Sequence, residues 1–286
     1  MMDTPASTER LRSWLGNQVQ SLLSGDRPPL DRSQNDDPGL FGPDSVAWKV
    51  HGNASMLIGG VRALLLQTLH PQAMAAVAEH SSYRNDPWGR LHRTGDFLRA
   101  TTFGSTADAE AAIEQVRRVH RRVVGIGPDG LPYQANDPHL LAWVHASELD
   151  SFLRAYQRYG GDPLGAADQD RYVGEMAQVA GRLGVVSPPT DRQALRKYLQ
   201  SMRHELRGTT AARQACQFIL RAPVPLAGRA AYGALGAGAV GLLPVFARRE
   251  LALPLPPGFD RLAAQPSARI VLRGLNWVLT PPAVAS

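Results

Sequence analysis

Apolar residues recur every three or four positions along most of the chain, which is the period of an amphipathic α-helix. This pattern predicts a first helix over residues 8–23, a long apolar run at 45–69, and a further helix that starts at Pro71 and runs through Ala78. Later helices are expected at about 94–101, 106–124, 137–159, 168–183, 191–206, 209–221, 226–248 and 266–279. No stretch alternates apolar and polar residues for long enough to predict a sheet. The expected fold class is all-α, with a single large globin-like helical domain.

Two apolar segments have the length of membrane spans. The first, 45–69, contains Lys49 and Arg62, which are costly at the depth of a bilayer. The second, 230–247, has 18 uncharged residues, but most are Ala or Gly and Pro244 lies among them. This weakly apolar composition favours a helix buried in a large helical core, where the glycines let another backbone come close. Weak association with a membrane is the minor alternative.

The charge balance is basic without pointing to nucleic acid. The 286 residues include 31 Lys and Arg against 25 Asp and Glu, a formal net charge of +6. Nearly all of the basic residues are Arg, spread among acidic residues, and aromatic residues make up only 7%. A nucleic-acid surface usually has a basic stripe with interleaved aromatics, so no nucleic-acid partner is expected.

The single cysteine, Cys216, excludes a disulfide scaffold and any cysteine-based metal cluster within one chain. It shares a predicted helix face with small and apolar residues, which favours a buried side chain over a thiolate that binds iron. The N-terminal stretch has no apolar signal core, so a cytoplasmic protein is expected.

His120 is the most informative of the eight histidines. It lies on one stripe of a predicted helix with Ile113, Val116 and Val123, while four arginines flank it at positions 117, 118, 121 and 122. One interpretation is a core histidine hydrogen-bonded to a carbonyl. The other is a ligand to a haem iron, because haem needs a neutral imidazole on an apolar wall and cationic groups near its propionates.

Two further segments offer candidate ligands. His145 follows Leu141 and Val144 in an apolar pattern and is the second candidate for the iron, whereas His70 precedes Pro71 and could serve a helix boundary. In the segment 83–94, Arg90, Arg93 and Thr94 are spaced i, i+3 and i+4, so they share a face if the segment is helical. Three donors on one face suit an anionic or oxygen-rich ligand. An exposed loop with a helix start is the alternative.

Several of these motifs together resemble a known family. In chain order they read DPGLFGPDSVAWKVHGNASMLIGGVRALLLQTLHP, RNDPWGRLHRTGDFL, VRRVHRRVVG and YQANDPHLLAWVHASELDSFL. This series is similar to the superfamily of rubber oxygenases (latex clearing proteins) and fungal MpaB oxygenases. The resemblance covers roughly residues 38–250, which we take as the catalytic domain. An N-terminal helix and polar loop, 1–37, precede it, and a C-terminal extension, 251–286, is expected to pack on it.

The resemblance implies a helical domain that encloses one haem b and oxidises an apolar substrate with dioxygen. The family's RxxH motif matches Arg117 to His120, which makes His120 the expected metal ligand, with Arg117, Arg121 and His145 as further haem-binding residues. Its RxxKT motif matches Arg90, Arg93 and Thr94 as the catalytic residues, with Arg in place of Lys. A guanidinium does not lose its proton, so Arg93 should not bind iron as a lysine amine could.

The rubber enzymes also use a distal carboxylate as a base, for which the nearest acid here is Glu79 and no secure equivalent is found. Cleavage of polymeric rubber is therefore not expected. The resemblance implies a haem b-dependent oxygenase acting on a small hydrophobic substrate. The alternatives are a non-catalytic helical protein that binds haem or another apolar ligand, and a helical interaction protein whose pocket is filled with side chains.

Overall fold

A computed structural model describes residues 37–256 and 258–279. The helix expected at 8–23, and nearly all of the N-terminal segment 1–37, lie outside the described residues. Over the described ranges the chain is one all-α domain with a single small hairpin, which confirms the expected fold class.

The apolar run at 45–69 is divided into two helices rather than one. Ser45 caps α2 (Val46–His51), and α3 (Met56–Gln67) begins after a short turn. The break occurs at Asn53, whose side-chain oxygen accepts a hydrogen bond from the Ser55 backbone N–H at 2.9 Å, in place of a helical partner. His70 then caps α4 (Pro71–His80) through its ring nitrogen Nδ1.

The other helices follow the predicted order with shifted ends, except that the single helix expected at 226–248 is wrong, because Pro244 divides it into two helices. The helices are α5 (Pro87–Phe103), α6 (Thr106–His120), α7 (Pro138–Tyr159), α8 (Ala166–Leu183), α9 (Arg192–Ser201), α10 (Thr210–Leu220), α11 (Arg229–Leu242), α12 (Val245–Glu250) and α13 (Gln265–Leu279). Short 3₁₀ turns lie at Met202–His204 and Leu226–Gly228, and a π-helical turn lies at Asp260–Ala264. Helix α5 begins earlier than predicted because Asp86 caps it and Pro87 supplies its first residue.

A hairpin of β1 (Val124–Ile126) and β2 (Pro132–Gln134) shows that the expectation of no strands was wrong. The strands are antiparallel, with Val124 opposite Gln134. Each strand has three residues, which is too short for an alternating pattern to be recognised. The turn between them uses Gly130, whose φ of +78° is readily adopted only by glycine.

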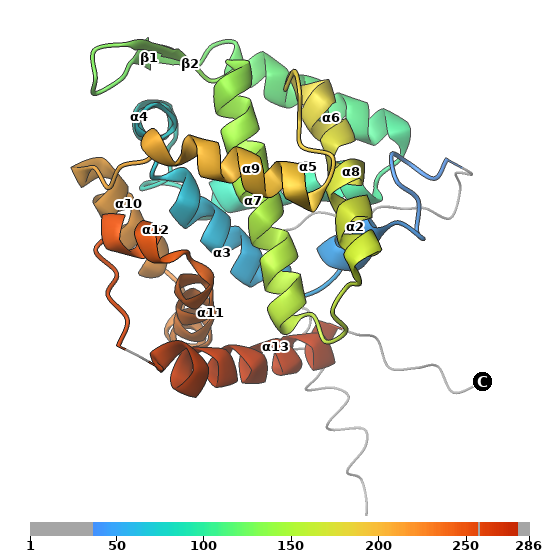
Figure 1. Cartoon of the computed structure of the whole chain (residues 1–286), viewed down its shortest axis with the longest axis vertical. Coiled ribbons are helices and arrows are strands. Elements are labelled where there is room, and N and C mark those ends of the chain that lie inside the picture. Colours follow the sequence, from blue (N-terminus) through green and yellow to red (C-terminus); the bar gives the residue numbers. More distant parts are fainter. Residues whose placement is uncertain (1–36, 257, 280–286) are drawn as a thin grey trace, which may run out of the picture.

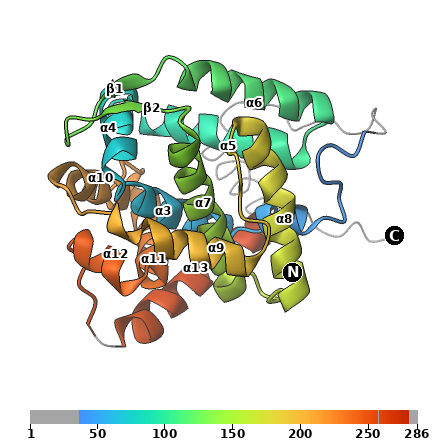
Figure 2. The same ribbon diagram turned by 45° about the horizontal axis from the view of Figure 1, so that its top comes forward.

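Helix α7 runs through the centre of the molecule, and α3 packs along it (Figure 1). The two backbones come close at Gly59, where a Cβ atom would lie 2.7 Å from Cδ1 of Phe152. Helices α5 and α6 lie side by side on one side of α7, while α11 and α13 lie on another (Figure 2).

Most of the segment 230–247 lies in the partly buried helix α11, which ends at Leu242, and its last three residues begin α12 after Pro244. Its inner face packs on α3 and α13. A Cβ atom at Gly238 would lie 3.1 Å from Cβ of Ala268, so the small residue permits the close packing of α11 on α13. Among the described helices, none combines the length and the apolar character needed to cross a membrane.

Arg62 connects three helices from a fully buried position in α3. Its side chain is 2% exposed, and its guanidinium contacts Asp150 Oδ2 at 2.8 Å and Ser151 Oγ at 2.6 Å, both in α7. Its Nε also donates to the carbonyl of Leu242 at the end of α11, at 3.0 Å. Arg62, the charged residue that makes a membrane span at 45–69 costly, therefore links α3 to α7 and α11 by polar contacts inside the core.

Candidate functional site

His120 is the last residue of α6 and lies on the inner stripe of that helix. Ser105 and Asp108 form a capping box that fixes the helix start, and Ala109 and Ile113 of the same stripe are buried. Burial lowers the pKa of His120, so the ring is neutral at pH 7. No hydrogen bond or ion pair engages this ring within the described part of the chain. His120 thus has a free lone pair to offer to a ligand.

A second imidazole is buried in α7. His145 is 8% exposed, burial lowers its pKa to about 4, and its Nε2 has no hydrogen-bond partner. Buried polar atoms are rarely left without a partner, and such a case needs an explanation. A bound group that contacts the ring would provide one.

Glu148 lies one turn after His145 on α7 and was missed at the sequence level. Burial raises the pKa of its carboxyl to about 7, and no hydrogen bond or ion pair holds it within the described residues. Its side chain nevertheless keeps some accessible surface. The carboxyl is therefore largely shielded from bulk water, although the residue as a whole is not fully buried.

A buried polar network adjoins Glu148. The His51 ring contacts the Thr102 hydroxyl at 2.7 Å through Nδ1 and the Tyr172 hydroxyl at 2.9 Å through Nε2. Burial lowers the pKa of His51 to about 3. Burial, and then the negative charges of Glu148 and Glu175, raise the pKa of Tyr172 well above its ordinary value. The helices α2, α5, α7 and α8 thus each contribute a polar group near one place.

The packing of the helices leaves α6 apart from α7. Helix α6 packs on α5 and α8, α5 packs on α2, and α7 packs on α8. Among the described residues, neither α5 nor α6 makes an extended contact with α7, although both lie beside it (Figure 2). The helices that carry His120 and Glu148 are therefore joined through α8 rather than packed directly on each other.

The three candidate catalytic residues share α5, as their spacing required, but differ in surroundings. Arg90 is half-buried, donates to Ser81 Oγ at 2.8 Å, and has a pKa that burial lowers. Arg93 is exposed and forms an ion pair with Asp86 at 3.3 Å. Thr94 is exposed, and its hydroxyl donates to the Arg90 carbonyl at 3.1 Å. Of the three, Arg90 is the one held away from solvent.

The arginines that flank His120 lie on the outer face of α6. Arg121 contacts Glu114 at 3.1 Å and Arg117 approaches the same carboxylate at 3.9 Å, with all three side chains about half exposed. Exposed ion pairs of this kind contribute about 0–1 kcal/mol, so either arginine can leave Glu114 at little cost.

Two minor candidates are accounted for by other contacts. The Glu79 carboxylate accepts a hydrogen bond from the Tyr133 hydroxyl of the hairpin at 2.6 Å. Cys216 is buried in the core beside Leu65 and Leu69, and burial raises the pKa of its thiol to about 11. A thiolate at this position is disfavoured, in agreement with the prediction of a buried side chain.

The buried histidines and Glu148 are typical of a helical protein that binds a cofactor. Two neutral imidazoles without partners, His120 on α6 and His145 on α7, are suited to hold a buried cofactor, and Glu148, one turn from His145, is suited to proton transfer. Residues 48–278 match the family described as ER-bound oxygenase mpaB/B'/Rubber oxygenase, catalytic domain. The chain belongs to this family, as its motifs predicted, and carries an oxygenase-type catalytic domain. Comparisons with curated proteins and with solved structures gave no match.

Proposed function

We propose that this protein is a haem b-dependent oxygenase that acts with dioxygen on a small hydrophobic substrate, with His120 as the iron ligand. The observation that carries the proposal is the neutral, partner-free ring of His120 on the inner stripe of α6. The unpartnered Nε2 of His145 also fits a bound group beside α7. When bound, the haem would supply the iron chemistry that activates dioxygen.

The arginines have distinct roles in this proposal. Arg90, half-buried on α5, would orient an oxygen-rich ligand through its guanidinium, and Thr94 would add a hydroxyl donor on the same face. Arg93 would contact substrate or close the pocket after it leaves Asp86. Arg117 and Arg121 would exchange Glu114 for haem propionates, since their present pairs are exposed and weak.

Glu148 is the candidate for proton transfer. A carboxyl with a pKa of about 7 both accepts and releases a proton near neutral pH, which is the requirement for a general acid or base. The hydroxyl of Tyr172, held by His51, lies close enough for its pKa to respond to the charge of Glu148. This pair would carry a proton between the pocket and the polar network.

We also propose a cytoplasmic location, since the single cysteine is a buried thiol that suits a reducing compartment. A helical protein that holds haem without catalysis is the second candidate. The two differ in turnover, because a carrier would bind haem without consuming dioxygen in the presence of an apolar substrate.

The purified protein should contain about one non-covalent haem per chain, because no CxxCH attachment motif is present. An absorption spectrum with a Soret band, together with pyridine haemochrome quantification, measures this. A colourless protein that also fails to take up added hemin would refute the haem proposal.

The raised pKa of Glu148 predicts a pH-dependent effect of Glu148→Gln. The folded protein keeps a proton to about pH 7 that the unfolded chain releases near the ordinary value of 4.5. The stability that this proton contributes is complete below about 4.5 and is lost as pH rises through 7. Relative to the wild type, Glu148→Gln should therefore become progressively more stable from pH 4.5 to 8. Urea unfolding at several pH values tests this, and parallel stability curves for the two proteins would contradict it.

A further inference from the structure

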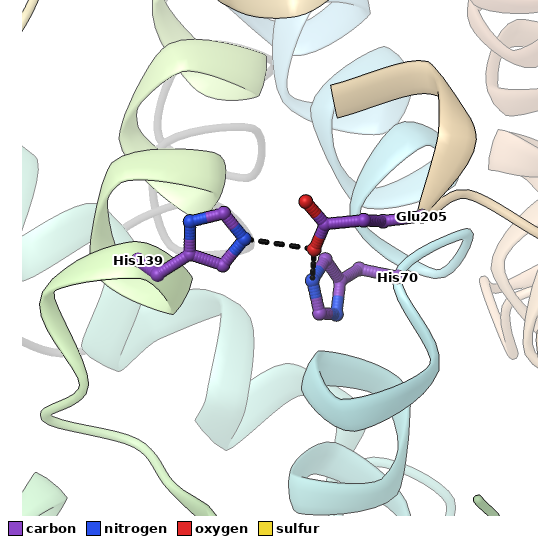
Figure 3. A group of neighbouring side chains, drawn as sticks. All are labelled: His70, His139 and Glu205. Atoms are coloured by element: carbon purple, nitrogen blue, oxygen red, sulfur yellow. Dashed lines mark hydrogen bonds and ion pairs between the residues drawn. The ribbon is translucent and has the colours of Figure 1, made fainter. Parts of the chain in front are cut away.

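Three side chains with metal-ligating atoms meet at a site that the proposed oxygenase chemistry does not use. His70 and His139 point toward the carboxylate of Glu205 (Figure 3). Glu205 Oε2 lies 2.8 Å from His139 Nε2 and 3.4 Å from His70 Nε2. One ligand atom from each residue lies within 4.8 Å of the others.

The three residues come from segments far apart in the chain, and backbone contacts hold them together. His70 is the N-cap of α4, and His139 lies in the first turn of α7, which Asp137 caps. Glu205 follows the 3₁₀ turn Met202–His204. The Arg207 N–H donates to the Leu69 carbonyl at 2.8 Å, which fixes the Glu205 segment beside His70. The donors are thus positioned by the fold.

The spacing of the donors is close to that of a bound metal. Zinc–nitrogen and zinc–oxygen bonds of about 2.0–2.1 Å in a tetrahedron place two ligand atoms about 3.3–3.4 Å apart. The 3.4 Å from His70 Nε2 to Glu205 Oε2 already matches this value. The 2.8 Å from His139 Nε2 is a hydrogen bond that would need to open by about 0.5 Å. The half-exposed His139 ring has room for that movement.

An unsatisfied atom points into the site. The His70 side chain is 4% exposed, and its Nε2 is buried without a hydrogen-bond partner, since the 3.4 Å contact with Glu205 is not aligned as a hydrogen bond. Its Nδ1 accepts the N–H of Ala73 at 3.4 Å, so the ring proton resides on Nε2. A cation at Nε2 would move that proton to Nδ1 and break a long, weak cap bond.

We infer that His70 Nε2, His139 Nε2 and the Glu205 carboxylate bind one divalent first-row cation of the Zn²⁺ type, with water completing the coordination. Two imidazoles and one carboxylate form a donor set that zinc accepts readily. The site is separate from the proposed haem pocket, because His139 and His145 lie on different faces of α7, about 9 Å apart along its axis. The cation would connect α4, α7 and the segment after α9.

Zinc titration of the chelator-treated full chain tests the site. Isothermal titration calorimetry and elemental analysis should give one Zn²⁺ per wild-type chain, and the Tm should rise with zinc concentration. His139→Ala and Glu205→Gln should each weaken binding by more than about tenfold. His80→Ala is the matched control, since it removes a histidine from the opposite end of α4, and it should bind zinc as the wild type does.

A second measurement uses only the wild type and so does not depend on the folding of a variant. Nitrogen-15 spectra of the His70 ring should show its proton on Nε2 without zinc and on Nδ1 with zinc. Zinc binding that is absent in the wild type, or equal in the wild type and Glu205→Gln, would overturn the inference. His120→Ala should keep the zinc site while it loses haem ligation, so failure of the haem proposal is distinguishable from failure of this one.

Discussion

Replacing His120 with alanine should abolish the axial ligation of the haem iron and greatly reduce haem retention. The ring is neutral because burial lowers its pKa, and it has no other partner to satisfy. No cysteine attachment exists to hold the macrocycle after the ligand is lost. The His120→Ala protein should therefore be purified with little haem, or with a spectrum shifted toward that of unligated ferric haem, as measured by absorption and resonance Raman spectroscopy.

His145→Ala is the matched control for this experiment. It removes a second buried, neutral imidazole from α7 and should leave iron ligation unchanged. Imidazole added to His120→Ala should restore a nitrogen-ligated spectrum, because the deleted ring leaves a space of its own shape. If His145→Ala lost the ligand and His120→Ala kept it, the iron ligand would be His145.

Arg62→Ala should destabilise the folded protein by about 3–5 kcal/mol, because it breaks a buried ion pair. The substitution leaves Ser151 Oγ and the Leu242 carbonyl without this donor and opens a cavity between α3, α7 and α11. Removal of one partner of such a pair costs more than the pair itself contributes. Urea unfolding, followed by circular dichroism, measures the change in the free energy of unfolding.

Arg154→Ala offers a control on the same carboxylate. Arg154 contacts Asp150 Oδ1 at 2.8 Å, but its side chain is 51% exposed against 2% for Arg62. Solvent screening should limit its loss to about 0–1 kcal/mol. Equal losses for the two variants would show that burial does not set the strength of these pairs.

The periodicity of the sequence was sufficient to place most helices, because a helix that packs on a core repeats its apolar residues every three or four positions. The periodicity was insufficient where local side-chain hydrogen bonds decide where a helix begins or ends. The Asn53 side chain divides the apolar run 45–69, and Asp86 starts α5 early. The hairpin at Val124–Gln134 depends on pairing between strands of three residues, which leave no recognisable pattern.

Part of the candidate site could also be predicted from the periodicity of the sequence. The stripe that contains His120 could be identified from sequence, since it depends on spacing within one helix. Glu148 carried a weak signal, because it lies one turn from His145 in the same segment. The raised pKa of Glu148 could not be predicted from the sequence, because it is caused by burial under neighbouring helices. The exposed pairing of Arg117 and Arg121 with Glu114 likewise depends on which face of α6 is turned outward.

The sequence by itself determined the helical class, the family, and the histidine that its motif presents from α6, because these depend on local periodicity and ordered motifs. Only the tertiary structure decided which polar groups meet. His70, His139 and Glu205 are separated by more than 60 residues between neighbouring members, and His51 reaches Tyr172 across 121 residues. Such contacts are created by packing between helices, and so are the desolvation and the pKa values that follow from it.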